Sequence, residues 1–224
     1  MLKDKVRSLA REYLPPSILR QLRSFRGPIK GEEQGAAFYD NSFANDDHWR
    51  RHYTESRYFP MWTVIADRIC RSRVRSILDI GCGPGQVAQL LHDKGIEKYL
   101  GIDFSTERIK QAKTVCPSCD FLAANVFETD LLSTHDYDGI VCLEFLEHVE
   151  RDVQVLERLR PGVLFWGSVP NFGGKQHVRH FLSSTEVIRR YADHFDDFKV
   201  NEHLANTDGT KYFLMEGVTK SFAH

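Results

Sequence analysis

The chain has 224 residues, of which 42% are hydrophobic and 27% charged, and a formal net charge of −1. These values are ordinary for a soluble globular protein and exclude a disordered or collagen-like chain. No apolar run approaches the roughly 18 residues that a membrane-spanning helix needs. The length suits one domain with an appendage.

Residues 1–30 differ from the rest of the chain in charge. They carry eight lysine and arginine residues and two acidic ones, a net charge of +6, whereas the remainder carries −7. Within 1–26 we expect two short helices that are broken at Pro15-Pro16. The second helix is amphipathic, with its arginines away from the apolar face formed by Ile18, Leu19, Leu22 and Phe25.

This basic arm has two interpretations. It packs on its own domain or frays, or it contacts an anionic membrane surface. The acidic remainder of the chain argues against nucleic acid as a partner. The glycines and proline between residues 27 and 35 predict a linker, so we assign 1–35 to the arm and linker.

Residues 36–62 are dense in aromatic side chains, and we expect a helical cap there. The aromatic residues are Phe38, Tyr39, Phe43, Trp49, Tyr53, Tyr58, Phe59 and Trp62. They exceed what the core of one helix needs, which favours a cap whose rings line a ligand pocket over a plain core helix. The predicted substrate contacts in the cap are Tyr53, Tyr58 and Trp62, with Trp49 beside them.

Strand and helix patterns alternate through the main domain, residues 63–224. Short apolar runs predict strands at 76–80, 99–102, 121–123, 139–143, 163–169, 198–202 and 212–218. Helices are expected over 105–114, 149–159 and 184–194, and another begins at 87–91. The alternation predicts an α/β, doubly wound, mainly parallel sheet with helices on both faces. Asn206-Thr207-Asp208-Gly209 is a hairpin signal that makes the last strand antiparallel.

Cysteine usage indicates a reducing compartment. The chain has five cysteines, and no signal-peptide pattern precedes them. We therefore expect a cytoplasmic protein, peripheral to the inner membrane face if the arm contacts lipid. Cys116-Pro-Ser-Cys119 lacks the second cysteine pair of a zinc site, so we interpret its spacing as chance.

A glycine-rich turn follows the first predicted strand. Residues 79–85 read Asp-Ile-Gly-Cys-Gly-Pro-Gly, and Asp103 ends the next strand. Glycines let a backbone approach a ligand closely, and an acid at this spacing accepts both hydroxyls of a ribose. The two features, each at a strand end, predict a nucleoside site rather than an unrelated turn and surface acid.

The details of the turn indicate which nucleoside. A dinucleotide site presents free N–H groups to pyrophosphate, but Pro84 has no N–H. Asp79 would repel a diphosphate and suits a cationic amino group. The ligand should therefore carry a ribose and an ammonium group.

At this point the chain resembles the class I S-adenosylmethionine-dependent methyltransferases, over residues 63–218. The resemblance implies a seven-stranded, Rossmann-like sheet with an antiparallel last strand, and S-adenosylmethionine as cofactor. The family usually has Asp where this chain has Asn125. The cofactor residues that it implies are Asp79, Gly81, Cys82, Gly83, Gly85, Asp103, Phe104, Asn125, Val126 and Leu143.

The end of the fourth predicted strand resembles a subgroup that includes the ubiquinone-type O-methyltransferases. Residues 143–149 read Leu-Glu-Phe-Leu-Glu-His-Val, a stretch that faces the substrate in such enzymes, whereas the Asn/Asp-Pro-Pro-Tyr motif of adenine-N-methyltransferases is absent. We expect His148 to act as a general base; a helix-start histidine that contacts backbone is the alternative. Some relatives with this spacing hold a divalent cation, so Glu144, Glu147 and His148 are metal candidates, completed by His177 or His180. Many relatives have the triplet without metal, so a metal is not favoured.

The loop after the fifth predicted strand completes the expected acceptor site. Its predicted substrate contacts, with Glu144, are His177, Arg179 and His180; a solvated loop is the alternative. Residues 53–58, the Trp62 run and the arm resemble methyltransferases of bacterial surface-polysaccharide pathways. We therefore expect methyl transfer to a hydroxyl of a sugar, glycan or other small molecule. The alternatives are a phenol or quinone-type acceptor, a non-catalytic cofactor-binding partner protein, and an oxidoreductase.

Overall fold

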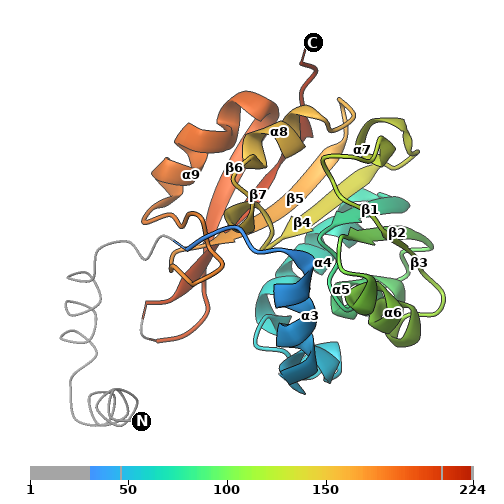
Figure 1. Ribbon diagram of the computed structural model, residues 1–224. Helices are drawn as coiled ribbons and strands as arrows, with labels where there is room; N and C mark the ends of the chain where they lie inside the picture. Colours follow the sequence, from blue (N-terminus) through green and yellow to red (C-terminus); the bar gives the residue numbers. More distant parts are fainter. Residues whose placement is uncertain (1–30, 46, 208, 223–224) are drawn as a thin grey trace, which may run out of the picture.

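A single mixed sheet organises the molecule, seen here in a computed structural model that describes residues 31–45, 47–207 and 209–222 (Figure 1). Its seven strands lie in the order β3-β2-β1-β4-β5-β7-β6. They are β1 (Ser76–Ile80), β2 (Lys98–Asp103), β3 (Asp120–Ala123), β4 (Gly139–Leu143), β5 (Leu164–Pro170), β6 (Phe195–Leu204) and β7 (Lys211–Thr219). The first five strands pair in parallel, and β7 is antiparallel to both β5 and β6. The predicted α/β fold with an antiparallel last strand is confirmed.

The strand order opens a crevice at one edge of the sheet. The chain proceeds outward from β1 through β2 to β3, then returns to the other side of β1 with β4. At such a reversal the connections after the two neighbouring strands leave in opposite directions. The carboxyl ends of β1, β2 and β4 therefore surround a space for a ligand.

Helices cover both faces of the sheet, and each face has its own hydrophobic core. One core contains residues of α4 (Phe59–Ser72), α5 (Gln86–Asp93) and α6 (Thr106–Val115). The other contains residues of α7 (Leu131–Thr134), α8 (Asp152–Glu157) and α9 (Ser184–Tyr191). Neighbouring strand residues such as Ile77 and Leu78 enter opposite cores, because side chains alternate across a strand.

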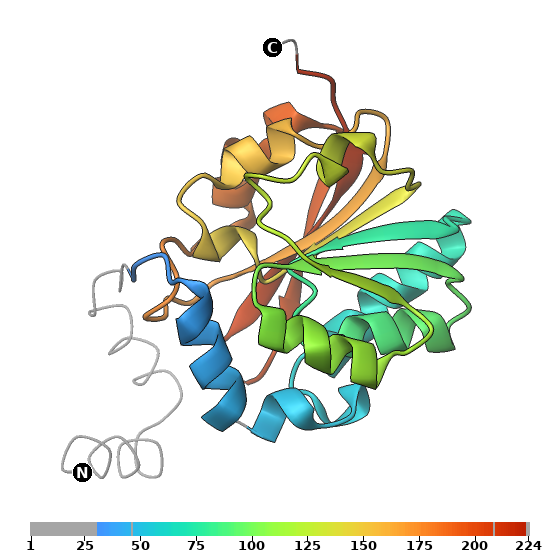
Figure 2. The same cartoon turned by 45° about the vertical axis from the view of Figure 1, so that its right-hand side comes forward.

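The cap consists of α3 (Ala36–Asn45), η1 (Asp47–Arg50), η2 (Tyr53–Glu55) and the first turn of α4. Figure 2 shows α3 running beside α6, with which it is in contact. α4 continues through the predicted boundary between residues 62 and 63, so cap and main domain share a helix. The structure of the basic arm lies outside the described residues.

The helix predicted at 149–159 is shorter than expected, and this correction affects the site. A 3₁₀ turn, η3 (Leu146–His148), comes first, Val149 is extended, and α8 begins only at Asp152. The cause is tertiary: the N–H groups of Val178 and Arg179 donate to the carbonyl of Glu147, at 2.9 and 3.4 Å. This pairing holds residues 146–149 against a distant loop and out of the helix.

Among the described residues, no helix has the length and apolar character needed to cross a membrane. The five cysteines are free thiols. Cys116 and Cys119 contact each other through sulfurs 3.0 Å apart, away from the group of possible metal ligands found in the described part of the chain.

Candidate functional site

A cavity of about 630 Å³ occupies the crevice at the carboxyl ends of β1, β2, β3 and β4. Its wall also includes the cap and the loop that follows β5. Most of the predicted cofactor residues line it: Asp79, Gly81, Cys82, Gly83, Asp103, Phe104, Asn125, Val126 and Leu143. The sheet topology therefore brings residues that are up to 64 positions apart into one site.

The three glycines of the turn have different roles. All have positive φ: 76° at Gly81, 55° at Gly83 and 85° at Gly85. A Cβ on Gly83 would meet nothing closer than 4.0 Å, whereas one on Gly85 would lie 2.8 Å from Cα of Ala112 in α6. Gly83 thus faces the open cavity. Gly85, predicted to bind cofactor, does not line the cavity; it allows the turn to pack closely on α6.

Two buried carboxyl groups lie at the ends of neighbouring strands. The oxygens of Asp103 accept N–H groups of Ser105 at 2.9 Å and Gly83 at 3.2 Å, which orients the carboxyl group. Burial raises the pKa of Asp103, and Arg108 opposes this shift. Asp79 accepts a hydrogen bond from the Tyr99 hydroxyl, and burial raises its pKa to about 7.

Asn125 lies on the cavity wall but has local hydrogen bonds. Its Nδ2 donates to Glu128 at 2.9 Å, and its Oδ1 accepts the N–H of Phe127 at 3.0 Å. The amide therefore shapes the turn after β3, and its predicted contact with adenine stays a prediction. Beside it, the guanidinium of Arg151 covers the ring of Phe127, 3.9 Å from the centroid.

Glu144 sits at the point where β4 enters the cavity. Its φ is 51°, a left-handed conformation that non-glycine residues rarely adopt and that concentrates at functional sites. Its carboxyl group accepts the Ser168 hydroxyl at 2.9 Å. Burial raises the pKa of Glu144 to about 8, so this carboxyl group is mostly protonated at neutral pH.

Glu147, His148 and His177 form a compact group, with one possible ligand atom from each lying within 4.8 Å of the others. Nδ1 of His148 lies 3.0 Å from the carbonyl of Gln176, and Nδ1 of His177 lies 3.0 Å from that of Phe172. A carbonyl only accepts, so both Nδ1 atoms carry hydrogen and both Nε2 atoms keep a lone pair. Neither carboxyl oxygen of the fully buried Glu147 has a hydrogen-bond partner in the described part of the chain.

The ionisation of this group follows from its burial. Burial lowers the pKa of His148 to about 3 and also lowers that of His177, so both rings are neutral at neutral pH. Burial together with Glu144 raises the pKa of Glu147. Of the predicted metal candidates, Glu147, His148 and His177 form this group, whereas Glu144 is not part of it and accepts a hydrogen bond from Ser168.

The predicted substrate residues divide into those that line the cavity and those that do not. Tyr58 and Trp62 do line it, as do Glu144 and His177. Trp49, Tyr58 and Trp62 form a stack with ring centroids 6.2 and 5.6 Å apart. This stack gives the cap side of the cavity an aromatic wall.

Three predicted substrate contacts lie outside the cavity wall: Tyr53, Arg179 and His180. The Tyr53 hydroxyl donates to Asp93 at 2.7 Å, on the outer side of the cap. Arg179 donates to the carbonyls of Leu146, Val149 and Glu150, so it supports the His148 segment rather than facing the cavity.

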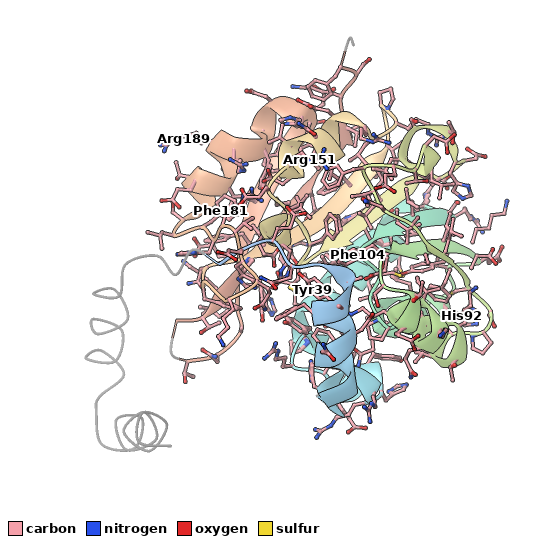
Figure 3. The ribbon with its side chains drawn as sticks, viewed as in Figure 1. Tyr39, His92, Phe104, Arg151, Phe181 and Arg189 are labelled. Atoms are coloured by element: carbon pink, nitrogen blue, oxygen red, sulfur yellow. The ribbon has the colours of Figure 1, made fainter. Side chains whose placement is uncertain are left out.

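Several wall residues were not predicted. Glu33 and Gln34 line the cavity although they belong to the predicted linker, because backbone bonds from Gly31 to His177 and from Glu32 to Lys175 dock that segment. Tyr39 was expected only as a cap aromatic, yet it reaches Phe104 and His148, with ring centroids at 5.5 and 6.0 Å (Figure 3). The other unpredicted side chains include Arg57, Arg108, Phe127 and Arg151. No sequence signal marks them, since tertiary packing alone directs them inward.

Comparison with known proteins identifies the fold family. Residues 77–162 match the family model of a methyltransferase domain. The match covers the glycine turn, Asp103 and the His148 segment. The fold is that of the class I S-adenosylmethionine-dependent methyltransferases.

The curated proteins that match this chain have varied acceptors in their names. The mitochondrial ubiquinone biosynthesis O-methyltransferase of Saccharomyces cerevisiae is 27% identical over 171 residues, 63% of this chain and 54% of that protein. Trans-aconitate 2-methyltransferase of Escherichia coli is 32% identical over 76 residues, 34% of this chain and 30% of that protein. The chain thus spans about half the length of the first curated relatives it matches.

Solved structures share the fold at low identity. The N-methyltransferase NodS from Bradyrhizobium japonicum, solved with S-adenosylhomocysteine, superposes with a TM-score of 0.64 at 18% identity, over 82% of this chain and 97% of that one. A Burkholderia thailandensis 1,6-didemethyltoxoflavin-N1-methyltransferase gives 0.62 at 20% identity, over 87% and 94%.

The cavity has the groups that S-adenosylmethionine would need. Asp103 presents an oriented carboxyl group to a diol, Gly83 leaves open space beside it, and Asp79 offers a buried acid to an ammonium group. These are the partners that a ribose and an amino acid moiety need.

Proposed function

We propose that this protein transfers the methyl group of S-adenosylmethionine to a hydroxyl group of a sugar, a glycan or another small molecule. The observation that supports this most directly is the composition of the cavity beyond the cofactor residues. There, a stack of three aromatic rings and the buried polar groups of Glu144 and His148 line the same cavity. Flat apolar rings suit the faces of a sugar or a phenol, and the polar groups suit its hydroxyls.

The chemistry needs little beyond positioning. S-adenosylmethionine, when bound, supplies a methyl group on a positively charged sulfur, which is already a good leaving group. The protein therefore has to hold the acceptor oxygen in line and exclude water. We propose that Nε2 of His148 accepts the proton of the acceptor hydroxyl. Its lone pair is available because the hydrogen of the ring is on Nδ1, which donates to the Gln176 carbonyl. Burial lowers the pKa of His148 to about 3 in the free protein. The base role therefore requires Glu147 in its ionised form, with Oε1 3.7 Å from that Nε2, to stabilise the resulting imidazolium.

A divalent cation is the second way to activate the hydroxyl. Glu147, His148 and His177 would hold it, because the orphaned carboxyl oxygens and the two oriented Nε2 atoms form a suitable oxygen and nitrogen set. A bound cation would lower the pKa of the acceptor hydroxyl. It would also occupy the His148 lone pair, so base and metal are alternatives.

A phenol or quinone-type acceptor is the main competing substrate class, and the ubiquinone O-methyltransferase relatives favour it. A non-catalytic cofactor-binding protein is the competing function. The oriented, buried polar groups of Glu144 and His148 support an enzyme, because a merely binding protein does not need them.

The test is a screen of sugars, nucleotide sugars and phenols with S-adenosylmethionine, read by mass spectrometry. We expect one class to gain a methyl group. His148→Ala should slow turnover about a hundredfold or more while the affinity for S-adenosylhomocysteine is retained. His92→Ala is the matched control, since His92 is exposed on α5, far from the cavity (Figure 3).

Four outcomes separate the alternatives. Unchanged turnover in His148→Ala contradicts the base. Loss of turnover in a chelator, restored by Mg²⁺ or Mn²⁺, supports the metal. Tight binding of S-adenosylhomocysteine without methylation of any acceptor in the screen supports the non-catalytic protein, and binding of NAD instead supports the oxidoreductase.

A further inference from the structure

Arg108 is a buried arginine at the junction of the cofactor residues and the cap. It lies in the first turn of α6, which begins just after Asp103 and is capped by the Ser105 hydroxyl. Its side chain is 11% exposed and lines the cavity. The guanidinium also borders the glycine turn, since a Cβ on Gly83 would lie 4.0 Å from its Nη1.

The contacts of Arg108 only partly compensate for its burial. Nη1 lies 4.0 Å from Oδ2 of Asp103, a long ion pair, and the buried Nε has no hydrogen-bond partner in the described part of the chain. Removing a charged group from water is costly unless it is well paired. A buried arginine that helps folding so little is expected to have a function.

The remaining contacts of Arg108 are with the cap. Its guanidinium lies 4.7 Å from the ring centroid of Tyr39 in α3 and 5.4 Å from that of Trp49 in η1. Both are cation–π distances. One side chain therefore touches two elements of the cap, α3 and η1, on one side and Asp103, the predicted ribose acid, on the other.

A second contact joins the same elements. Ser105 is the N-cap residue of α6. Its hydroxyl donates to Asp40 in α3, next to Tyr39. The backbone N–H of Ser105 donates to Asp103 at 2.9 Å. Asp103 and α3 thus both contact Ser105, the N-cap residue of α6, and Arg108 in the first turn of that helix.

We propose that Arg108 is a positioning residue that couples binding of the cofactor ribose at Asp103 to closure of the cap. When the ribose diol binds the carboxyl group of Asp103, both Asp103 and Arg108 are fixed in position. Arg108 then keeps its cation–π contacts with the rings of Tyr39 and Trp49. When the cap opens, the guanidinium loses both rings and the orientation of Asp103 weakens. The coupling is reciprocal, as any such linkage must be.

This inference rests on the proposed function only in requiring that the cavity binds S-adenosylmethionine. It adds an order of events: the cofactor closes the cap, and the closed cap then completes the aromatic wall that meets the acceptor. The charge of Arg108 also lowers the pKa of Asp103, against the larger effect of burial. Replacing the arginine should therefore affect affinity and cap closure together.

The experiment compares the full-length wild type with Arg108→Met, Arg108→Lys and the control Lys110→Met. Lys110 lies on the same helix, but its side chain is 71% exposed and pairs with Glu107. The affinity for S-adenosylhomocysteine is measured by calorimetry. Hydrogen exchange of the backbone amides at residues 36–41, with and without S-adenosylhomocysteine, reports cap closure.

In the wild type and Lys110→Met, we expect S-adenosylhomocysteine to slow exchange in α3. Arg108→Met should bind about tenfold more weakly, within the usual range of coupling between sites. At saturating ligand it should show little slowing in α3. Arg108→Lys should recover affinity, because it keeps the charge near Asp103, and should protect α3 only in part, because an ammonium group lacks the planar face.

Two results would overturn the proposal. One is wild-type affinity and wild-type protection of α3 in Arg108→Met. The other is weakened binding with full protection of α3, since Arg108 would then act on Asp103 alone. If Arg108→Met does not fold, as judged by its thermal transition, full protection in Arg108→Lys counts against the coupling. A wild type that fails to bind S-adenosylhomocysteine refutes the proposed cofactor itself, and this outcome is distinct from the other two.

Discussion

Asp79 and Asp103 lie at the ends of adjacent strands, but their environments differ. Asp103 is held by two backbone N–H groups and faces Arg108, whereas Asp79 has the Tyr99 hydroxyl as partner and no cation paired with it among the described residues. The pKa of Asp79 therefore rises to about 7, mainly through burial. An ammonium group that binds beside this carboxyl group would lower its pKa again and favour the ionised form.

Cofactor binding should consequently release protons. Below its raised pKa, Asp79 is largely protonated in the free protein, and the ligand ammonium group binds the ionised form. Affinity for S-adenosylhomocysteine should thus increase as the pH rises from about 6 to about 7, with proton release. Calorimetry in buffers of different ionisation enthalpy measures the number of protons that are released on binding.

Other titratable groups near Asp79 make a control variant necessary. They include Asp103, Cys82 and Tyr99. Asp79→Asn keeps the shape of the side chain but cannot ionise. We expect it to bind more weakly and without the pH dependence. Equal proton release in this variant and in the wild type would show that another group is responsible.

At the scale of elements, the loop that follows β5 holds the segment that contains His148 in place, although the two are distant in sequence. The loop after β5 accepts the His148 Nδ1–H through Gln176 and donates to the Glu147 carbonyl through Val178. Arg179 completes the join, reaching three carbonyls of the His148 segment and lying 3.2 Å from the buried Asp152. Its role is to fix one loop against the other.

Arg179→Met should therefore destabilise the fold. It leaves carbonyls without donors and removes one of the cations around Asp152, although Arg190 and Tyr191 still bind that acid. We expect a loss of about 3 kcal/mol in the free energy of unfolding. Urea titration measures this loss, with Arg189→Met as control because Arg189 is exposed on α9 and points outward (Figure 3). Equal stability of the two variants would argue for a role in substrate contact, as first predicted.

For the whole molecule, the basic residues of the arm and the acidic residues of the candidate site belong to different parts of the sequence. The described wall of the cavity begins at Glu33, after the arm with its net charge of +6. The acids of the cofactor site belong to the remainder, which carries −7. We propose that the arm places a cytoplasmic enzyme on an anionic membrane surface, where glycan acceptors are assembled.

Replacing Arg20, Arg23 and Arg26 by glutamine tests this placement in the full chain. Each basic residue near an anionic surface contributes about 1 kcal/mol, so cosedimentation with phosphatidylglycerol vesicles should weaken about a hundredfold. The affinity for S-adenosylhomocysteine should not change. The control replaces Arg71, Arg73 and Arg75, which are exposed on the main domain. If the arm variant sediments like the wild type, the arm does not bind membrane.

The local pattern of residues was enough to predict the sheet and the residues at the ends of β1, β2 and β4 that line the cavity. Strands such as β1 and β4 are short apolar runs with clear ends, and Gly83 and Asp103 lie directly at strand ends, where the alternation of elements already fixes their neighbours. The acceptor half was not predictable in the same way. His177 was predicted beside Glu147 and His148, but Arg179 turns away to support them and Arg108 reaches the cap, because each of these contacts depends on how segments far apart in sequence pack together. Periodicity reports which face of an element is buried; only the packed structure decides which distant side chain that face meets.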